Sequence, residues 1–143
     1  MSVKGKIGPA QITISFWFFA VLAATVWLGG DAIRLLLAAA VHEGGHLAAA
    51  FFCGGKIRSV EFGGFGIRIR PFFSRLPSAR REAAMLLAGP AAGFVACVPA
   101  LLCGRWRFAL LSAGLSCFNL LPFPGLDGGG LLALGRKYKS LKI

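Results

Sequence analysis

The stretch that decides the fold is residues 32–52, which read AIRLLLAAAVHEGGHLAAAFF. It is apolar apart from Arg34 and a polar group made of His42, Glu43 and His46. A helix needs about 20 apolar residues to cross the hydrocarbon core of a bilayer, so this stretch predicts a transmembrane helix. Ionisable side chains inside such a helix are costly and usually functional. We therefore expect a membrane protein with its functional site inside this helix.

The composition of the chain fits a membrane protein. Hydrophobic residues make up 57% of its 143 residues and charged residues 15%, whereas soluble domains usually carry about 25% charged residues. Three further apolar stretches are long enough to cross a bilayer, and we expect helices at about 11–30, 83–104 and 106–121. The predicted fold class is an all-α membrane protein with about four transmembrane helices, in which residues 1–143 form a single membrane-embedded domain.

A cleaved signal peptide is the alternative for residues 11–30, because Lys4 and Lys6 precede this apolar stretch. The apolar core of a signal peptide usually has about 7–15 residues. The stretch is longer than that, so we favour a retained helix.

The basic residues predict the orientation in the membrane. With four crossings, the N-terminus, the segment after the second helix and the basic tail 136–143 lie on one side and hold 13 of the 16 Lys and Arg residues. The other side keeps Arg34, Arg105 and Arg107. The positive-inside rule then predicts a multi-pass protein of the cell membrane with both termini cytoplasmic. Because the basic residues lie between apolar runs, we expect them to contact membrane lipids and expect no nucleic-acid partner.

Residues 57–70 have the pattern of strands. Phe65, Ile67 and Ile69 alternate with Gly66, Arg68 and Arg70, and Gly63-Gly64 precede them. The pattern predicts a small β-hairpin that turns at the two glycines, between the second and third helices.

His42-Glu43-Gly44-Gly45-His46 is an HExxH motif. On a helix, positions i and i+4 share a face, so the two imidazoles can bind one zinc ion and Glu43 can reach a zinc-bound water as a base. The alternative is a pair of structural histidines, but it leaves Glu43 as a costly charge in lipid. Gly44 and Gly45 fit either close helix packing or close approach to the metal, and both interpretations stay open.

A third ligand is expected to be a carboxylate, because catalytic zinc sites often combine two histidines with one acid and leave a position for water. Asp31 lies roughly 16 Å from His42 along the helix, at 1.5 Å per residue. Asp127 instead follows an apolar segment broken by prolines, and irregular backbone at membrane depth is tolerated mainly where it lines a site. Asp127 is therefore the predicted third ligand. The alternative is that it caps the short helix that follows.

The paired motifs resemble those of the site-2 protease family of intramembrane metalloproteases. The resemblance is carried by His42, Glu43 and His46, then by Asn119, Pro122, Leu126, Asp127 and Gly128, with Phe62-Gly63-Gly64 and Ala88-Gly89-Pro90 between them. The compact form most resembles the branch that processes a precursor sigma factor during sporulation. The resemblance implies a three-helix catalytic core, formed by the second to fourth helices and open to the cytoplasm. Two positions depart from the family pattern: Gly93, where Asn is frequent, and Gly130, where Arg is frequent.

The predicted function is intramembrane zinc-dependent endopeptidase, with one Zn²⁺ per chain and Glu43 as general base on a zinc-bound water. Asn119 is predicted to hydrogen-bond the water or the tetrahedral oxyanion. The substrate would be a transmembrane or membrane-associated protein, added as an extended strand to the hairpin at Gly63, Gly64 and Phe65. Two alternatives are a catalytically silent membrane relative and an ion or proton transporter that uses the same polar cluster. The sequence sets no oligomeric state.

Overall fold

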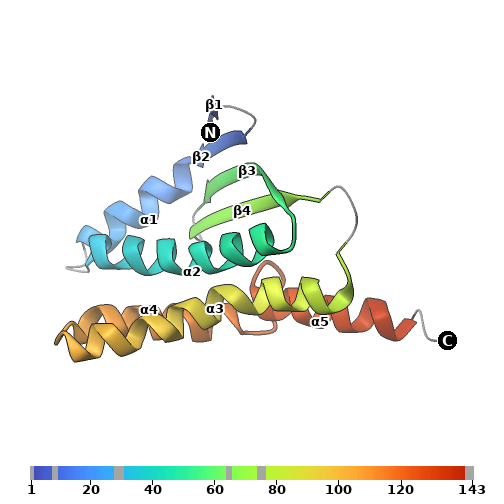
Figure 1. The fold of residues 1–143 in the computed structure, drawn as a ribbon. Helices are drawn as coiled ribbons and strands as arrows, with labels where there is room; N and C mark the ends of the chain where they lie inside the picture. Colours follow the sequence, from blue (N-terminus) through green and yellow to red (C-terminus); the bar gives the residue numbers. More distant parts are fainter. Residues whose placement is uncertain (1, 8–9, 28–30, 64–65, 74–76, 141–143) are drawn as a thin grey trace.

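Five helices and four strands make up the described part of the chain (Figure 1). The structure is a computed structural model that describes residues 2–7, 10–27, 31–63, 66–73 and 77–140. The elements in chain order are β1 (Ser2–Ile7), β2 (Ala10–Ser15), α1 (Phe16–Trp27), α2 (Ala32–Phe52), β3 (Lys56–Gly63), β4 (Gly66–Phe72), α3 (Ala79–Leu102), α4 (Trp106–Asn119) and α5 (Asp127–Ser140).

The helix α2 has the bounds predicted from the sequence, and local chemistry explains both ends. The Asp31 carboxylate accepts a hydrogen bond from the backbone N–H of Arg34 at 3.0 Å, which satisfies an otherwise unpaired amide of the first turn. At the other end Gly54 has φ +79°, and the N–H of Gly55 donates to the carbonyl of Ala50 at 2.8 Å. This is the Schellman arrangement, in which glycine ends a helix without steric cost.

Two helices, α2 and α3, are long and apolar enough to cross a membrane, with mean hydropathies of 1.4 and 2.0 in the described part of the chain. The helices α1 and α4 have 12 and 14 residues, which is less than the roughly 20 needed for a full crossing. The prediction of four crossings therefore stays a prediction. The segment after α4 leaves helical geometry before Pro122 and Pro124, as expected of prolines that cannot continue a helix.

The predicted helix at 11–30 is wrong in its first part, because Ala10–Ser15 form the strand β2 and α1 begins only at Phe16. The sequence of β2 contains Ile12, Thr13 and Ile14, and such β-branched residues favour strands. Pairing with β3 in a parallel register, Ile12 against Val60, decides the local structure. In the sequence, the length of the apolar run outweighed the strand preference of these β-branched residues.

The sheet is larger than the predicted hairpin, so the mainly helical fold is not purely α. Its strand order is β1-β2-β3-β4, with β3 and β4 antiparallel and Gly63 paired with Gly66. These two strands occupy the region predicted as a hairpin at 57–70. Gly64 and Phe65, between them, lie outside the described residues.

The helix α2 lies in the middle of the molecule. Figure 1 shows the sheet and α1 on one side of it and α3, α4 and α5 on the other, with β4 the strand that packs on α2. Among the side chains whose burial the structure describes, the buried apolar ones are mostly alanines: Ala38, Ala50, Ala100, Ala109 and Leu134. Small residues of this kind are typical of contacts between membrane helices.

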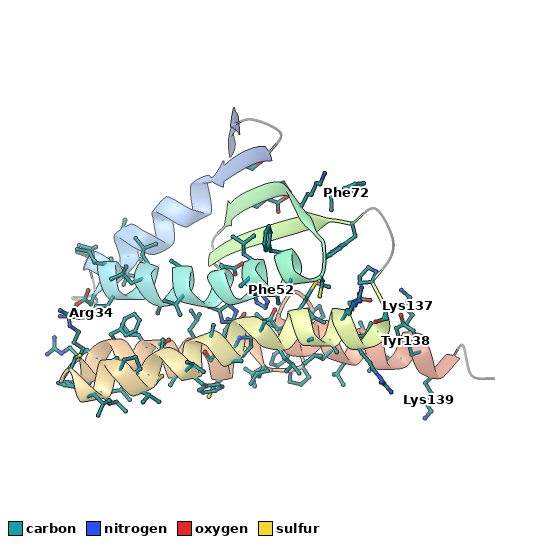
Figure 2. All side chains as sticks on the ribbon, in the orientation of Figure 1. Arg34, Phe52, Phe72, Lys137, Tyr138 and Lys139 are labelled. Carbon is teal, nitrogen blue, oxygen red and sulfur yellow. The ribbon has the colours of Figure 1, made fainter. Side chains whose placement is uncertain are left out.

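Large apolar side chains point outward over much of the molecule (Figure 2). Phe52 is 87% exposed, Leu102 84% and Val95 70%. Soluble monomers rarely expose large continuous apolar areas. The exposed surface therefore fits contact with lipid around α2 and α3.

Candidate metal centre

The helix α2 presents His42 and His46 on one face, as the i and i+4 spacing requires. Their Nε2 atoms lie 3.2 Å apart, and the rings meet edge to face with centroids 4.9 Å apart. The side chain of His42 is only 4% exposed and that of His46 18%. Both imidazoles are thus directed at one point inside the helix bundle.

Asp127 joins this pair from the far end of the sequence. It is the first residue of α5, and its Oδ2 lies 3.1 Å from His42 Nε2 and 3.2 Å from His46 Nε2. The turns between α4 and α5, where Gly125 has φ +94°, bring the chain back to α2. One ligand atom from each of the three side chains lies within 4.8 Å of the others.

The hydrogen-bond chemistry of this cluster fits a cation. The Nδ1 atom of His46 lies 2.7 Å from the carbonyl oxygen of Met85. A carbonyl only accepts, so Nδ1–H donates, and in the neutral form of the ring Nε2 carries the lone pair. That lone pair faces the carboxylate of Asp127, and two acceptors at 3.2 Å need a proton or a cation near both. A divalent metal bound by two histidines and one carboxylate satisfies this arrangement.

The carboxylate of Asp127, which lies outside the long apolar helices α2 and α3, is suited to be a ligand. Burial raises the pKa of this carboxyl, but the hydrogen bonds with His42 and His46 and the charges of the same two residues outweigh it. The net effect holds the pKa of Asp127 below its ordinary value. The group is therefore ionised at neutral pH, as metal ligation requires.

Close packing of α3 on α2 holds His46 in place. A Cβ at Gly89 would overlap the imidazole of His46, so a larger residue at this point of α3 would displace the ring. A Cβ at Gly45 would overlap the carbonyl oxygen of Ala88, whereas one at Gly44 would meet nothing within 4 Å. Gly45 thus serves helix packing, and Gly44 lies on an exposed part of α2.

Gly93 serves a different contact from Gly89. A Cβ there would overlap the hydroxyl of Ser116 on α4. The carbonyl of Gly93 accepts a hydrogen bond from Ser112 Oγ at 3.0 Å, and Ser116 Oγ donates to the carbonyl of Ser112 at 2.8 Å. Gly93 therefore joins α3 to α4.

The remaining predicted site residues lie as follows. Glu43 is partly buried on α2, directly after His42, and its charge acts on His46. The side-chain amide of Asn119 donates to the carbonyl of Leu115 at 3.0 Å, within its own helix. Gly63 ends β3, whereas Gly64 and Phe65 lie outside the described residues. The roles predicted for Asn119 and for the turn stay predictions.

The contact that sequence reasoning missed is the Met85 carbonyl on His46. It is a backbone atom, so no residue type marks it. The nearby Ala88-Gly89-Pro90 was the available signal, because it places a close approach on the same helix.

Comparison with known proteins shows a likeness among solved structures. No family model matches the chain, and no curated protein matches its sequence. Among solved structures the chain is similar to the site-2 protease from Methanocaldococcus jannaschii, with a TM-score of 0.77 and 24% sequence identity. The likeness covers 96% of this chain and 74% of that one. The chain therefore has the fold of a site-2 protease.

Proposed function

We propose that this chain is an intramembrane metalloprotease that hydrolyses a peptide bond of a transmembrane or membrane-associated protein. The observation that carries the proposal is the convergence of His42, His46 and Asp127 on one point of α2, a helix long and apolar enough to cross a membrane. A buried donor set of this kind is costly in lipid unless it has a function. The site-2 protease fold supports the same conclusion.

The proposed cofactor is one Zn²⁺ per chain, held by His42, His46 and Asp127. Two histidines and a carboxylate are a frequent ligand set of catalytic zinc, and they leave a position open. The ion would supply Lewis acidity for the scissile carbonyl and for the attacking water. The hydrogen bond from His46 Nδ1 to the carbonyl of Met85 fixes the orientation of the ring and, in its neutral form, leaves Nε2 as the ligating nitrogen.

Glu43 is the proposed general base. It follows the first histidine on α2, where it takes the proton of the attacking water and passes it to the leaving amine. Asn119, at the end of α4, is proposed to donate to the oxyanion once its amide leaves the carbonyl of Leu115. In this proposal His42 and His46 are both ligands, so the oxyanion role falls to a side chain other than histidine.

The edge of the sheet supports a proposal for how the substrate is held. A helical substrate hides its peptide groups in internal hydrogen bonds, so it must be extended before it is cut. The strand β4 ends the order β1-β2-β3-β4 and packs on α2, the helix of the two histidines. An extended segment added to β4 would run beside the metal centre, with Gly63, Gly64 and Phe65 as the proposed contacts.

The proposed location is the cell membrane, with several crossings and both termini cytoplasmic. The charge distribution supports this orientation, because 13 of the 16 Lys and Arg residues fall on the side of the termini.

The test pairs metal content with cleavage of a single-pass membrane substrate by the full chain in detergent. We expect wild type to hold about one zinc per chain and to cleave. Glu43→Gln should keep zinc and lose at least about a hundredfold in rate. Asp127→Ala should lose both zinc and cleavage. Glu82→Gln removes a carboxylate in the first turn of α3 and is the matched control, expected to behave as wild type.

Two results would contradict the proposal. Wild type without metal, or Glu43→Gln with full cleavage, would remove the assigned chemistry. Zinc-independent ion flux in liposomes that requires His42 and Asp127 would favour the transporter. Zinc binding without turnover of any membrane substrate would favour a catalytically silent relative.

A further inference from the structure

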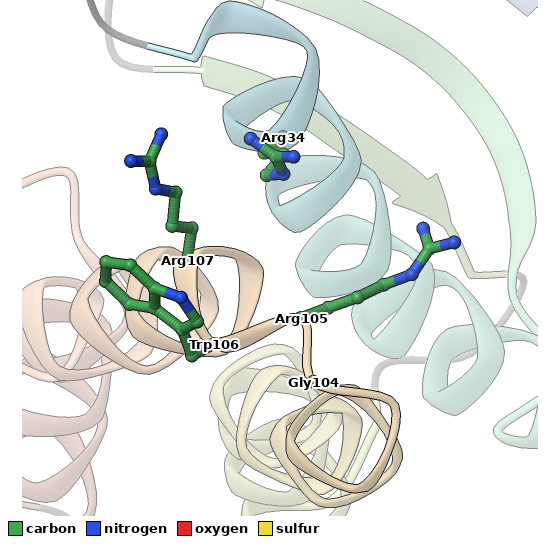
Figure 3. A pocket seen from close by; sticks show the side chains of 5 residues that line it. All are labelled: Arg34, Gly104, Arg105, Trp106 and Arg107. Atoms are coloured by element: carbon green, nitrogen blue, oxygen red, sulfur yellow. The ribbon is translucent and has the colours of Figure 1, made fainter.

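A second polar site lies at the other end of α2 from the metal centre (Figure 3). It is a pocket with a volume of about 270 Å³, lined by Arg34, Gly104, Arg105, Trp106 and Arg107. Arg34 precedes His42 on α2 by about 12 Å, at 1.5 Å per residue, so the pocket is separate from the metal cluster. It joins the start of α2 to the turn between α3 and α4.

The three arginines of the pocket are the same three that the predicted orientation leaves on the non-cytoplasmic side. Lys and Arg are scarce in loops on that side of membrane proteins. Here all three line one pocket instead of lying scattered. Three arginines around one pocket, on the side where basic residues are scarce, indicate a local role for their charge.

The charge of the pocket is unbalanced. Asp31 forms an ion pair with Arg34. No carboxylate pairs with Arg105 or Arg107 in the part of the chain that the structure describes. The guanidinium of Arg107 lies 5.3 Å from the ring centroid of Trp106, a cation–π distance that leaves its N–H groups available.

The turn that carries these side chains is fixed by its backbone. Gly104 has φ +68°, and its N–H donates to the carbonyl of Leu101 at 3.0 Å. The N–H of Arg105 donates to the carbonyl of Ala100 at 2.8 Å. This Schellman turn fixes where α4 begins. The backbone positions of Arg105, just before α4, and of Arg107, in its first turn, are therefore fixed as well.

From this geometry we propose that the pocket binds a phosphate group. A guanidinium presents its N–H donors as a planar fork that matches two phosphate oxygens. Arg105 and Arg107 carry two such forks on the rim of the same pocket, and Arg34 lines it from α2. Figure 3 shows the side chains of Arg105 and Arg107 extending in different directions, so the phosphate is proposed to draw them together by a change of rotamer.

The surroundings favour a phospholipid head group as the source of the phosphate. Leu102 and Trp106 flank the turn and are 84% and 55% exposed. Tryptophan is enriched at the boundary between membrane and water, where head-group phosphates lie. A phosphate ester from the aqueous side is the other source, and the experiment separates the two.

The test measures binding to the full chain in a neutral detergent by native mass spectrometry. The probes are phosphatidylglycerol, diacylglycerol, which lacks the phosphate, and inorganic phosphate. The variants are Arg105→Gln with Arg107→Gln, and Arg105→Lys with Arg107→Lys, which keeps the charge but not the fork. The control pair Arg136→Gln with Lys139→Gln removes the same charge from the exposed end of α5. Thermal unfolding shows that each variant is folded.

We expect one phosphatidylglycerol per chain and no retained diacylglycerol. The glutamine pair should raise the Kd by about ten- to a hundredfold, the lysine pair should raise it less, and the control pair should leave it nearly unchanged. Inorganic phosphate that binds with the same dependence on Arg105 and Arg107, without retained lipid, would support the site and assign it to an aqueous phosphate. Equal losses in the glutamine and control pairs, no loss in either, or equal binding of diacylglycerol would overturn it.

Discussion

At the residue scale, the contact between Gly89 and His46 decides how well the proposed metal ligands are placed. The imidazole occupies the volume that a Cβ at residue 89 would need. Gly89→Ala should therefore push His46 away from Asp127 and weaken zinc binding by about 10- to 100-fold, as changes beside metal ligands do. Zinc titration with a competing chelator measures this.

The control for this prediction is Gly114→Ala on α4. A Cβ at Gly114 would meet nothing within 4 Å, and alanine is the better helix former. Zinc affinity should stay at the wild-type value. Equal zinc affinity in Gly89→Ala and wild type would show that His46 has room to move.

The three side chains that the structure brings together could be found in the sequence, whereas the contacts that hold them could not. His42, His46 and Asp127 stood out because ionisable side chains are rare in apolar segments. The carbonyl of Met85 could not be predicted, because every residue has one and only the packing of α3 on α2 selects it. Gly89 lies in the Ala88-Gly89-Pro90 stretch that carried part of the resemblance, but only the structure shows that it contacts His46.

At the element scale, glycines in left-handed conformation end the long helices. Gly54→Ala should destabilise the protein by about 1–2 kcal/mol, because residue 54 has φ +79° and an L-residue with a side chain is strained there. Gly135→Ala is the matched control within α5. Both positions have open space around a Cβ, so only backbone conformation differs.

Thermal unfolding in detergent checks this pair of variants. Gly135→Ala should be neutral or stabilising by up to about 1 kcal/mol, since glycine is a poor residue inside a helix. Equal melting temperatures for the two variants would contradict the role given to Gly54.

Prediction of the elements succeeded where the local signals agreed. In α2 the apolar length, the capping Asp31 and Gly54 all agree on the same bounds. In residues 10–15 two signals conflicted, the apolar run and the β-branched residues. A partner strand nearly 50 residues later decided the outcome, as the pairing of Ile12 with Val60 shows. Single-sequence reasoning cannot weigh such a distant partner.

At the scale of the whole molecule, two native cysteines can report the orientation. Cys53 ends α2 and Cys103 ends α3, next to the arginine pocket. If both termini are cytoplasmic, a membrane-impermeant maleimide added to intact cells should label Cys103 and not Cys53. The variants keep one cysteine each, with the other three replaced by serine.

Permeabilised cells give the control, because Cys103 is exposed and Cys53 partly exposed, so both should then react. Labelling of Cys53 alone in intact cells would invert the predicted orientation. It would also place the arginine pocket in the cytoplasm.

The path of the chain to the metal centre has a consequence for synthesis. His42 and Asp127 are 85 residues apart in the sequence, and the three donors meet only after α3, α4 and the return to α5 have formed. A nascent chain still on the ribosome, or one truncated before α5, lacks the third donor. The proposed hydrolytic centre is therefore complete only after residue 127 has been translated. Unfinished copies would then be unable to cut neighbouring proteins during their insertion into the membrane.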